Sequence, residues 1–136
     1  MIQKQKTYLL TIAIMLLLPF SIKAQTIKTN NMNNKIVIGN IYVPKAAIEE
    51  FKKQFNLSND FLKNQPGYLG LLAFEHTDDS GNLNVVTVAT WQNEELATRA
   101  RQSMQAEYKR INFNQTEYYE RLQIKASREI YNVLQH

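Results

Sequence analysis

The chain contains no cysteine among its 136 residues. This absence excludes a disulfide framework, a thiolate metal site, a cysteine nucleophile and the lipid anchor of bacterial lipoproteins. Only two histidines are present, His76 and His136, so we expect no histidine-rich metal site. Prolines and glycines are few, and the charged fraction of 21% is ordinary for a folded protein. The length and composition therefore indicate one folded domain.

Residues 1–24 have the pattern of a secretory signal peptide. Lys4 and Lys6 precede a short apolar run at residues 9–20, LLTIAIMLLLPF, and the small residue Ala24 ends the segment. As a helix this run would rise only about 18 Å, whereas the hydrocarbon core of a bilayer is about 30 Å thick. We therefore expect cleavage after Ala24 and export to the periplasm or the medium, with no stable membrane anchor. An uncleaved N-terminal anchor is the alternative.

The positive charge of the whole chain belongs mainly to this leader. The formal net charge is +4, and removing Lys4, Lys6 and Lys23, with no acid lost, leaves +1. Proteins that bind nucleic acid need a clustered positive surface. We therefore expect no nucleic-acid partner.

The rest of the chain alternates segments rich in β-branched residues with amphipathic ones. A polar, asparagine-rich linker at 25–34 precedes the domain expected at 35–136. The β-forming runs predict strands at 35–43, 68–75, 83–91 and 128–134. Apolar spacing and capping residues predict helices at 44–64, 93–111 and 114–125. The order β-α-β-β-α-(α)-β predicts an α+β, ferredoxin-like antiparallel sheet.

Both faces of this predicted sheet are apolar. One row of the second strand holds Leu69, Leu71 and Ala73. The other row holds Tyr68, Leu72 and Phe74. The helices of a chain this short can cover only one face. We therefore expect the other face to pack against a second copy and form a homodimer, with a tolerated apolar surface as the alternative.

These features resemble the antibiotic biosynthesis monooxygenase domain, a member of the dimeric α+β barrel superfamily. The matching segments are VPK at 43–45 with IEEF at 48–51, PGYLG at 66–70, and the strand 85–91 with the acidic helix start QNEE at 92–95. The resemblance covers residues 35–134. It implies a homodimer whose two sheets close a barrel, and a small-molecule ligand.

The resemblance also implies a chemistry that needs no cofactor. Some members of the family are oxygenases that use no metal, flavin or haem, because an electron-rich phenol or dihydroquinone supplies the electrons. The protein binds the ring in a dry cavity and favours its anion with preorganised donors. The expected function is a monooxygenase acting on a small electron-rich aromatic molecule. The alternative is a binding or stress-related module of the same fold that lacks the chemistry.

Five residues are candidates for binding the substrate: Trp91, Asn40, Tyr42, Thr87 and Arg110. In the resembling oxygenases a tryptophan at the position of Trp91 contacts the substrate, and Thr87 stands where they carry an amide. Arg110 adjoins the position of an arginine that would stabilise an anionic oxygen. Asn40 and Tyr42 form a polar pair on an apolar row of the first strand, which suggests a pocket wall. Each also has a purely structural interpretation, as a packing aromatic, a satisfied buried group or a charge at a helix end.

The chain departs from the family pattern at several positions. Ala97 stands where the resembling oxygenases have a tyrosine, and Thr87 replaces their amide. Ala100 and Arg110 stand where haem-degrading relatives have a tryptophan and the histidine that ligates iron. We therefore do not expect haem degradation.

Overall fold

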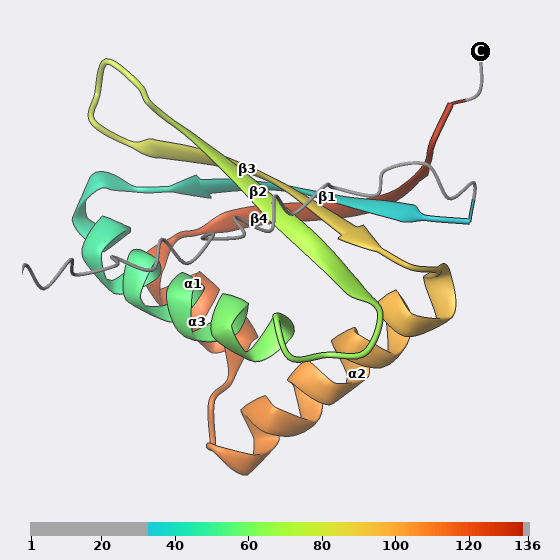
Figure 1. Cartoon of the computed structure of the whole chain (residues 1–136). Coiled ribbons are helices and arrows are strands. Elements are labelled where there is room, and N and C mark those ends of the chain that lie inside the picture. The colour runs from blue at the N-terminus through green and yellow to red at the C-terminus, as the bar shows by residue number, and fades with distance from the viewer. Residues whose placement is uncertain (1–32, 135–136) are drawn as a thin grey trace, which may run out of the picture.

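The computed structural model describes residues 33–134, so the predicted signal peptide and nearly all of the predicted linker lie outside the described residues. The strands are β1 (Lys35–Val43), β2 (Tyr68–Thr77), β3 (Leu83–Trp91) and β4 (Lys125–Asn132) (Figure 1). The helices are the 3₁₀ turn η1 (Lys45–Ala47), α1 (Ile48–Leu62), α2 (Glu94–Arg110) and α3 (Gln115–Leu122). In this described part of the chain, no helix is both long and apolar enough to cross a membrane.

The four strands form one antiparallel sheet in the order β2-β3-β1-β4. β2 and β3 form a hairpin, and a helical segment follows both β1 and β3, as the sequence predicts. Figure 1 shows α1, α2 and α3 on the same side of the sheet. This arrangement confirms the predicted α+β, ferredoxin-like fold.

Asparagine side chains begin two of the helices. The Oδ1 atom of Asn93 accepts a hydrogen bond from the backbone N–H of Leu96 at 2.9 Å, at the start of α2. The Oδ1 atom of Asn114 accepts from the N–H groups of Thr116 and Glu117 at 3.1 and 3.2 Å, at the start of α3. These bonds satisfy donors that the first turn of a helix leaves free. Both predicted helix starts are confirmed.

The last strand begins earlier than the sequence predicts, and the last helix is correspondingly shorter. The prediction places the strand at 128–134, whereas β4 begins at Lys125. Gln123 ends α3 in the left-handed conformation, with φ of 55°, and this reverses the chain at once. Residues other than glycine rarely adopt that conformation, so the pattern of residues does not reveal it. As a consequence, Arg128 lies in the middle of β4 rather than at its start.

The side of the sheet that faces the helices carries two separate clusters of buried side chains. The first, here called the α1–α3 core, consists of Val43, Ala47, Phe51, Leu83, Val85, Tyr118 and Ile124. The second, here called the α2 core, consists of Val37, Ala89, Trp91, Ala97 and Ala100. Burial of this apolar surface is the main force that holds the helices on the sheet.

The opposite side of the sheet, here called the open face, is also apolar. Leu72 and Phe74 of β2 are 56% and 57% exposed, and Tyr131 of β4 is 48% exposed. Val86 of β3, which pairs with Phe74, is also exposed. The apolar character of both faces is therefore confirmed, and residues 33–134 of one chain supply no cover for this one.

One of the predicted rows of β2 is wrong at its start. A β-bulge between Tyr68 and Gly70 shifts the register of β2 against β3. The bulge turns Tyr68 toward the helices, where its ring meets that of Trp91 edge-on with 5.5 Å between the centroids. Leu69 is exposed instead. Strict alternation along a strand assumes that no residue is inserted, so the sequence pattern misses this change.

Replacing Asn93 by alanine should destabilise the fold. The substitution removes the side-chain acceptor at the start of α2, so the free energy of unfolding should fall by about 1 kcal/mol. Urea unfolding followed by circular dichroism measures the change. The neighbouring Gln92→Ala alters an exposed side chain and should change the free energy by less than about 0.5 kcal/mol. Equal effects of the two substitutions would contradict the capping role.

Candidate functional site

A row of four residues crosses the helix-facing side of the sheet between the two cores. Cross-strand pairing aligns Ala73 of β2, Thr87 of β3, Gly39 of β1 and Arg128 of β4. None of the four belongs to the α1–α3 core or the α2 core. Ala73 and Arg128 are exposed, and Thr87 is half-buried. Gly39 is buried between them. This row, here called the central row, therefore has solvent-exposed ends on the side where the helices otherwise cover the sheet.

The absence of a side chain at Gly39 makes room for Thr87. A Cβ atom at residue 39 would lie 2.6 Å from Oγ1 of Thr87, which is far inside van der Waals contact. The hydroxyl of Thr87 therefore lies directly over the backbone of Gly39. A glycine in a strand commonly marks such a close approach. The central row thus combines one hydroxyl group with two small residues.

An arginine gives one end of the central row a positive charge. Arg128 ends the row on β4, and Arg101 belongs to α2. Nearby protein atoms desolvate part of the exposed Arg128 side chain, and the charge of Arg101 also acts on it, so the pKa of Arg128 lies below its ordinary value. Within residues 33–134, neither arginine forms an ion pair with an acid.

Trp91 and Thr87 both lie on the helix-facing side, but only Thr87 belongs to the central row. Trp91 is 2% exposed and packs in the α2 core against Tyr68. Its indole therefore lines no open space in this structure. Contact between Trp91 and a ligand would require the α2 core to rearrange.

Asn40 and Tyr42 lie on the other side of the sheet. Successive side chains on a strand point to opposite faces. Because Gly39 pairs with Thr87 on the helix-facing side, Asn40 lies on the open face, opposite Val86 of β3. Tyr42 shares this side with Asn40. The structure therefore does not bring the predicted pocket wall together with Trp91.

Arg110 lies apart from all the other predicted residues, at the C-terminal end of α2. Its guanidinium donates two hydrogen bonds to the carboxylate of Glu107, at 2.7 and 2.6 Å, and its side chain is 70% exposed. These bonds lower the pKa of Glu107 and raise that of Arg110. The contacts of Arg110 are those of a charge that complements the end of a helix.

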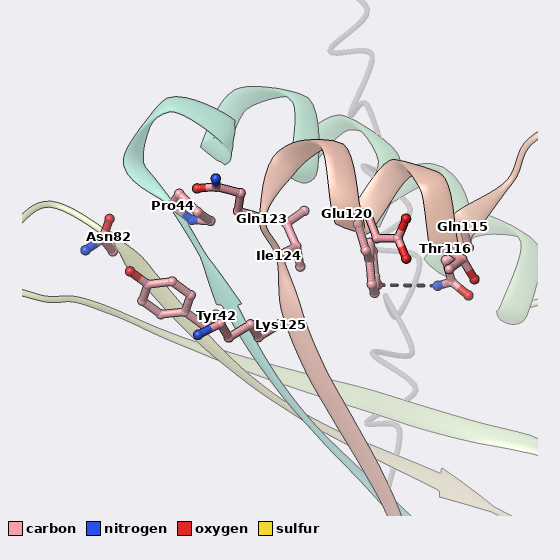
Figure 2. A pocket seen from close by; sticks show the side chains of 10 residues that line it. Tyr42, Pro44, Asn82, Gln115, Thr116, Glu120, Gln123, Ile124 and Lys125 are labelled. Carbon is pink, nitrogen blue, oxygen red and sulfur yellow. Dashed lines mark hydrogen bonds between the residues drawn. The ribbon is translucent and has the colours of Figure 1, made fainter.

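Two grooves lie outside the central row, and one of them includes Tyr42. The first, here called the α3 groove, has a volume of about 860 Å³. Figure 2 shows it between side chains of α3, such as Gln115 and Glu120, and Tyr42 and Asn82 at its other end. Several of its polar groups already bond within the protein. Asn82 accepts from the backbone N–H of Lys45 at 3.1 Å, and Gln115 donates to Tyr119 at 3.3 Å.

The second groove runs between α1 and α3 and has a volume of about 840 Å³. An ion pair between Glu50 and Arg121 joins the two helices at this groove, and it lowers the pKa of Glu50. The hydroxyl of Tyr118 is buried beside it and has no hydrogen-bond partner within residues 33–134. In the same part of the chain, no group of three or more histidine, aspartate or glutamate side chains is placed to hold a metal ion.

The sequence prediction did not single out Arg101 or Arg128. It placed Arg128 at the start of the last strand, and Arg101 adjoins the apolar stripe of the helix. Only the pairing register of β1 with β4 shows that Arg128 faces the helices at the level of Gly39. The one local signal is Gly39 itself, a glycine inside a run of β-branched residues.

A family model described as "Antibiotic biosynthesis monooxygenase" matches residues 35–112. The match includes β1, α1, the β2–β3 hairpin and α2, and therefore three of the four strands that carry the central row. No curated protein sequence matches the chain.

Several solved structures share the fold. A candidate monooxygenase from Shewanella loihica PV-4 is 21% identical, with a TM-score of 0.56 over 78% of this chain and 100% of that one. A variant of SnoaB, a cofactor-independent oxygenase from Streptomyces nogalater, is 16% identical, with a TM-score of 0.56 over 75% and 95%. A variant of MhuD, with two manganese protoporphyrin IX molecules bound per active site, is 22% identical, with a TM-score of 0.54 over 75% and 96%. At these identities the likeness establishes the fold alone.

Substituting Gly39 by alanine tests the close approach in the central row. The new methyl group would collide with Oγ1 of Thr87, so the free energy of unfolding should fall by about 1–3 kcal/mol. In a Thr87→Ala background the obstructing atom is absent, and the same substitution should cost much less. A double-mutant cycle from urea unfolding measures the difference. Equal costs in the two backgrounds would show that Thr87 does not lie over Gly39.

Proposed function

The chain belongs to the antibiotic biosynthesis monooxygenase family, and from this premise we propose that it is an exported, cofactor-independent monooxygenase acting on a small electron-rich aromatic molecule. The observation that carries the proposal is the central row. It offers a hydroxyl donor, small residues and positive charge on the helix-facing side of the sheet, between two apolar cores. The fold of the chain is similar to that of a cofactor-independent oxygenase, and this similarity supports the proposed activity.

The chemistry requires the substrate to supply every electron. A phenol loses its proton, and the anion transfers electrons to dioxygen. One oxygen atom becomes a carbonyl oxygen on the ring and the other leaves as water, so phenol and dioxygen give quinone and water in balance. The protein contributes by holding the ring away from water and by stabilising the phenolate with a fixed donor, the task that we assign to Thr87.

A second candidate is a binding module of the same fold that has no catalytic activity. The observation that favours it is Trp91, which is 2% exposed inside the α2 core. In the resembling oxygenases the tryptophan at this position contacts the substrate. Because Trp91 is buried in the α2 core, its ring is not available to contact a ligand.

We also propose that two copies pack their open faces together and close a barrel. Exposed Leu72, Phe74, Val86 and Tyr131 form an apolar surface on that face. A large uncovered apolar patch of this kind usually marks an interaction surface. Isologous pairing of identical patches is the simplest way to cover it. The barrel would leave the central row of each copy accessible, because that row lies on the opposite side of the sheet.

Export follows from the leader at residues 1–24, which lies outside the described residues. Its basic start, short apolar run and small final residue support removal during secretion. The proposed active form is therefore the chain from Gln25 onward, in the periplasm or the medium.

Oxygen uptake tests the proposed activity. The chain from Gln25 onward, mixed with a panel of hydroquinones and phenols, should consume dioxygen faster than the protein-free mixture and place one ¹⁸O atom from ¹⁸O₂ in the product. Thr87→Val removes the donor and should lower kcat by about 10²-fold. The control Thr116→Val, on exposed α3, should not change the rate. Uptake equal to the protein-free mixture for every compound would leave the binding module as the better account.

Sedimentation velocity tests the proposed dimer. The native chain should sediment as a dimer at micromolar concentration, and Phe74→Glu should yield monomers because a charge in an apolar interface is costly. Leu57→Glu is a matched control, since Leu57 on α1 and Phe74 are each 57% exposed. The control should remain dimeric. A monomeric native chain, or equal loss of dimer in both variants, would contradict pairing through the open face.

A further inference from the structure

The proposed oxidation requires a group that accepts the phenolic proton. Carboxylates and imidazoles are common proton acceptors in enzymes. The side chains of the four strands include two carboxylates and one imidazole, those of Glu75, Glu129 and His76. Glu129 lies on the open face, opposite Ile38, and His76 lies on the same face, opposite Asn84. Among these strand side chains, Glu75 is therefore the one acceptor of this kind on the helix-facing side.

Glu75 lies beside the exposed β2 end of the central row. It follows Ala73 by two residues, and side chains two residues apart on a strand point to the same face. Glu75 pairs with Val85, so Thr87 is its diagonal neighbour on β3. Residues in this relation lie about 7–8 Å apart, a gap that long side chains can span. A substrate ring lying over Ala73 would thus have Thr87 on one side and the carboxylate of Glu75 on another.

An ion pair holds the carboxylate of Glu75 at this place. The Nζ atom of Lys52 on α1 lies 3.1 Å from Oε2 of Glu75. Because α1 covers the helix-facing side of the sheet (Figure 1), this contact agrees with the side that the register gives to Glu75. The two side chains are 45% and 61% exposed, so a ligand can reach them. A carboxylate has about four lone-pair positions, so Glu75 can bind Lys52 and still accept another hydrogen bond.

We propose that Glu75 is the general base of the reaction, which accepts a hydrogen bond from a substrate hydroxyl and then takes its proton. This inference rests on the proposed function, because it assigns a residue to the same reaction at the same row. The O–H bond of the phenol breaks, a new O–H bond forms on Glu75, and the electron pair stays on the phenolate.

The proton on Glu75 returns to the oxygen that leaves. The phenolate transfers electrons to dioxygen and forms a peroxide on a ring carbon, and Glu75 protonates the outer oxygen of this peroxide. When the O–O bond breaks, the ring carbon loses its own proton and becomes the carbonyl. The outer oxygen leaves as water with both protons, and Glu75 is a carboxylate again. Atoms, electrons and charge therefore balance without any other reactant.

Steady-state oxygen uptake by the chain from Gln25 onward tests the base. Glu75→Gln keeps the size of the side chain and a hydrogen-bond acceptor but cannot take a proton, so kcat should fall by about 10²-fold or more. KM should change by less than about threefold, because the contact with the substrate remains. Glu75→Ala should lose as much of the rate, and added acetate should restore part of it by supplying a free carboxylate. A merely structural role would give no response to acetate.

Glu49→Gln is the matched control, because Glu49 is an exposed glutamate on α1, the helix that carries Lys52. It should keep the native kcat. Circular dichroism and the urea midpoint check that the variants fold. Native kcat in Glu75→Gln, equal loss in the control, or no effect of acetate on Glu75→Ala would overturn the assignment of the base.

Calorimetry without dioxygen separates this inference from the proposed activity. Hydroquinone and 1,4-dimethoxybenzene share a ring, but only hydroquinone has hydroxyl donors. The native chain should bind hydroquinone at least about tenfold more tightly, and Glu75→Met should lose most of this preference. Equal affinity of the native protein for the two probes, or no binding of hydroquinone at millimolar concentration, would overturn the contact with Glu75.

The two measurements together distinguish the possible failures. If hydroquinone is preferred and the preference depends on Glu75, but no dioxygen is consumed, the contact stands and the monooxygenase assignment fails. If dioxygen is consumed and the Glu75 variants behave like the native protein, the activity stands and the general base fails.

Discussion

The structure depends on how three helices cover one side of a four-stranded sheet. The helices meet that side at two places, the α1–α3 core and the α2 core, and leave the two ends of the central row between them, Ala73 and Arg128, exposed. The other side of the sheet receives no helix and remains apolar. Both proposed binding events follow from this single constraint. A ligand occupies the gap between the cores, and a second copy covers the open face.

The fold could be predicted from the sequence because its signals are local. β-branched runs mark the strands, and Asn93 and Asn114 mark the starts of α2 and α3. The errors occur where the backbone departs from regular repetition. The bulge at Tyr68 turns that ring into the α2 core, and the left-handed Gln123 starts β4 three residues early. Gly70, with φ of 153°, lies at the bulge and is the residue type that commonly marks one, whereas Gln123 carries no such signal.

The candidate site was harder to predict because it depends on which strands pair and on which face each residue lies. Resemblance pointed to Thr87, which lies in the central row, and to Trp91, which is buried in the α2 core. Asn40 follows Gly39 on β1, but successive side chains on a strand point to opposite faces, so Asn40 lies on the open face. Arg128 joins the site only through the register of β4 against β1. That register follows from the tertiary fold, so residue spacing alone does not supply it.

We propose that ligands bind at the central row and not in either groove. Amide chemical-shift mapping by two-dimensional NMR, during titration with 2,5-dihydroxybenzoate, tests this most directly. Binding at the central row should give the largest shifts on Gly39, Thr87 and Arg128. Largest shifts on residues of the α3 groove, such as Tyr119 and Gln123, with the central row unchanged, would contradict it.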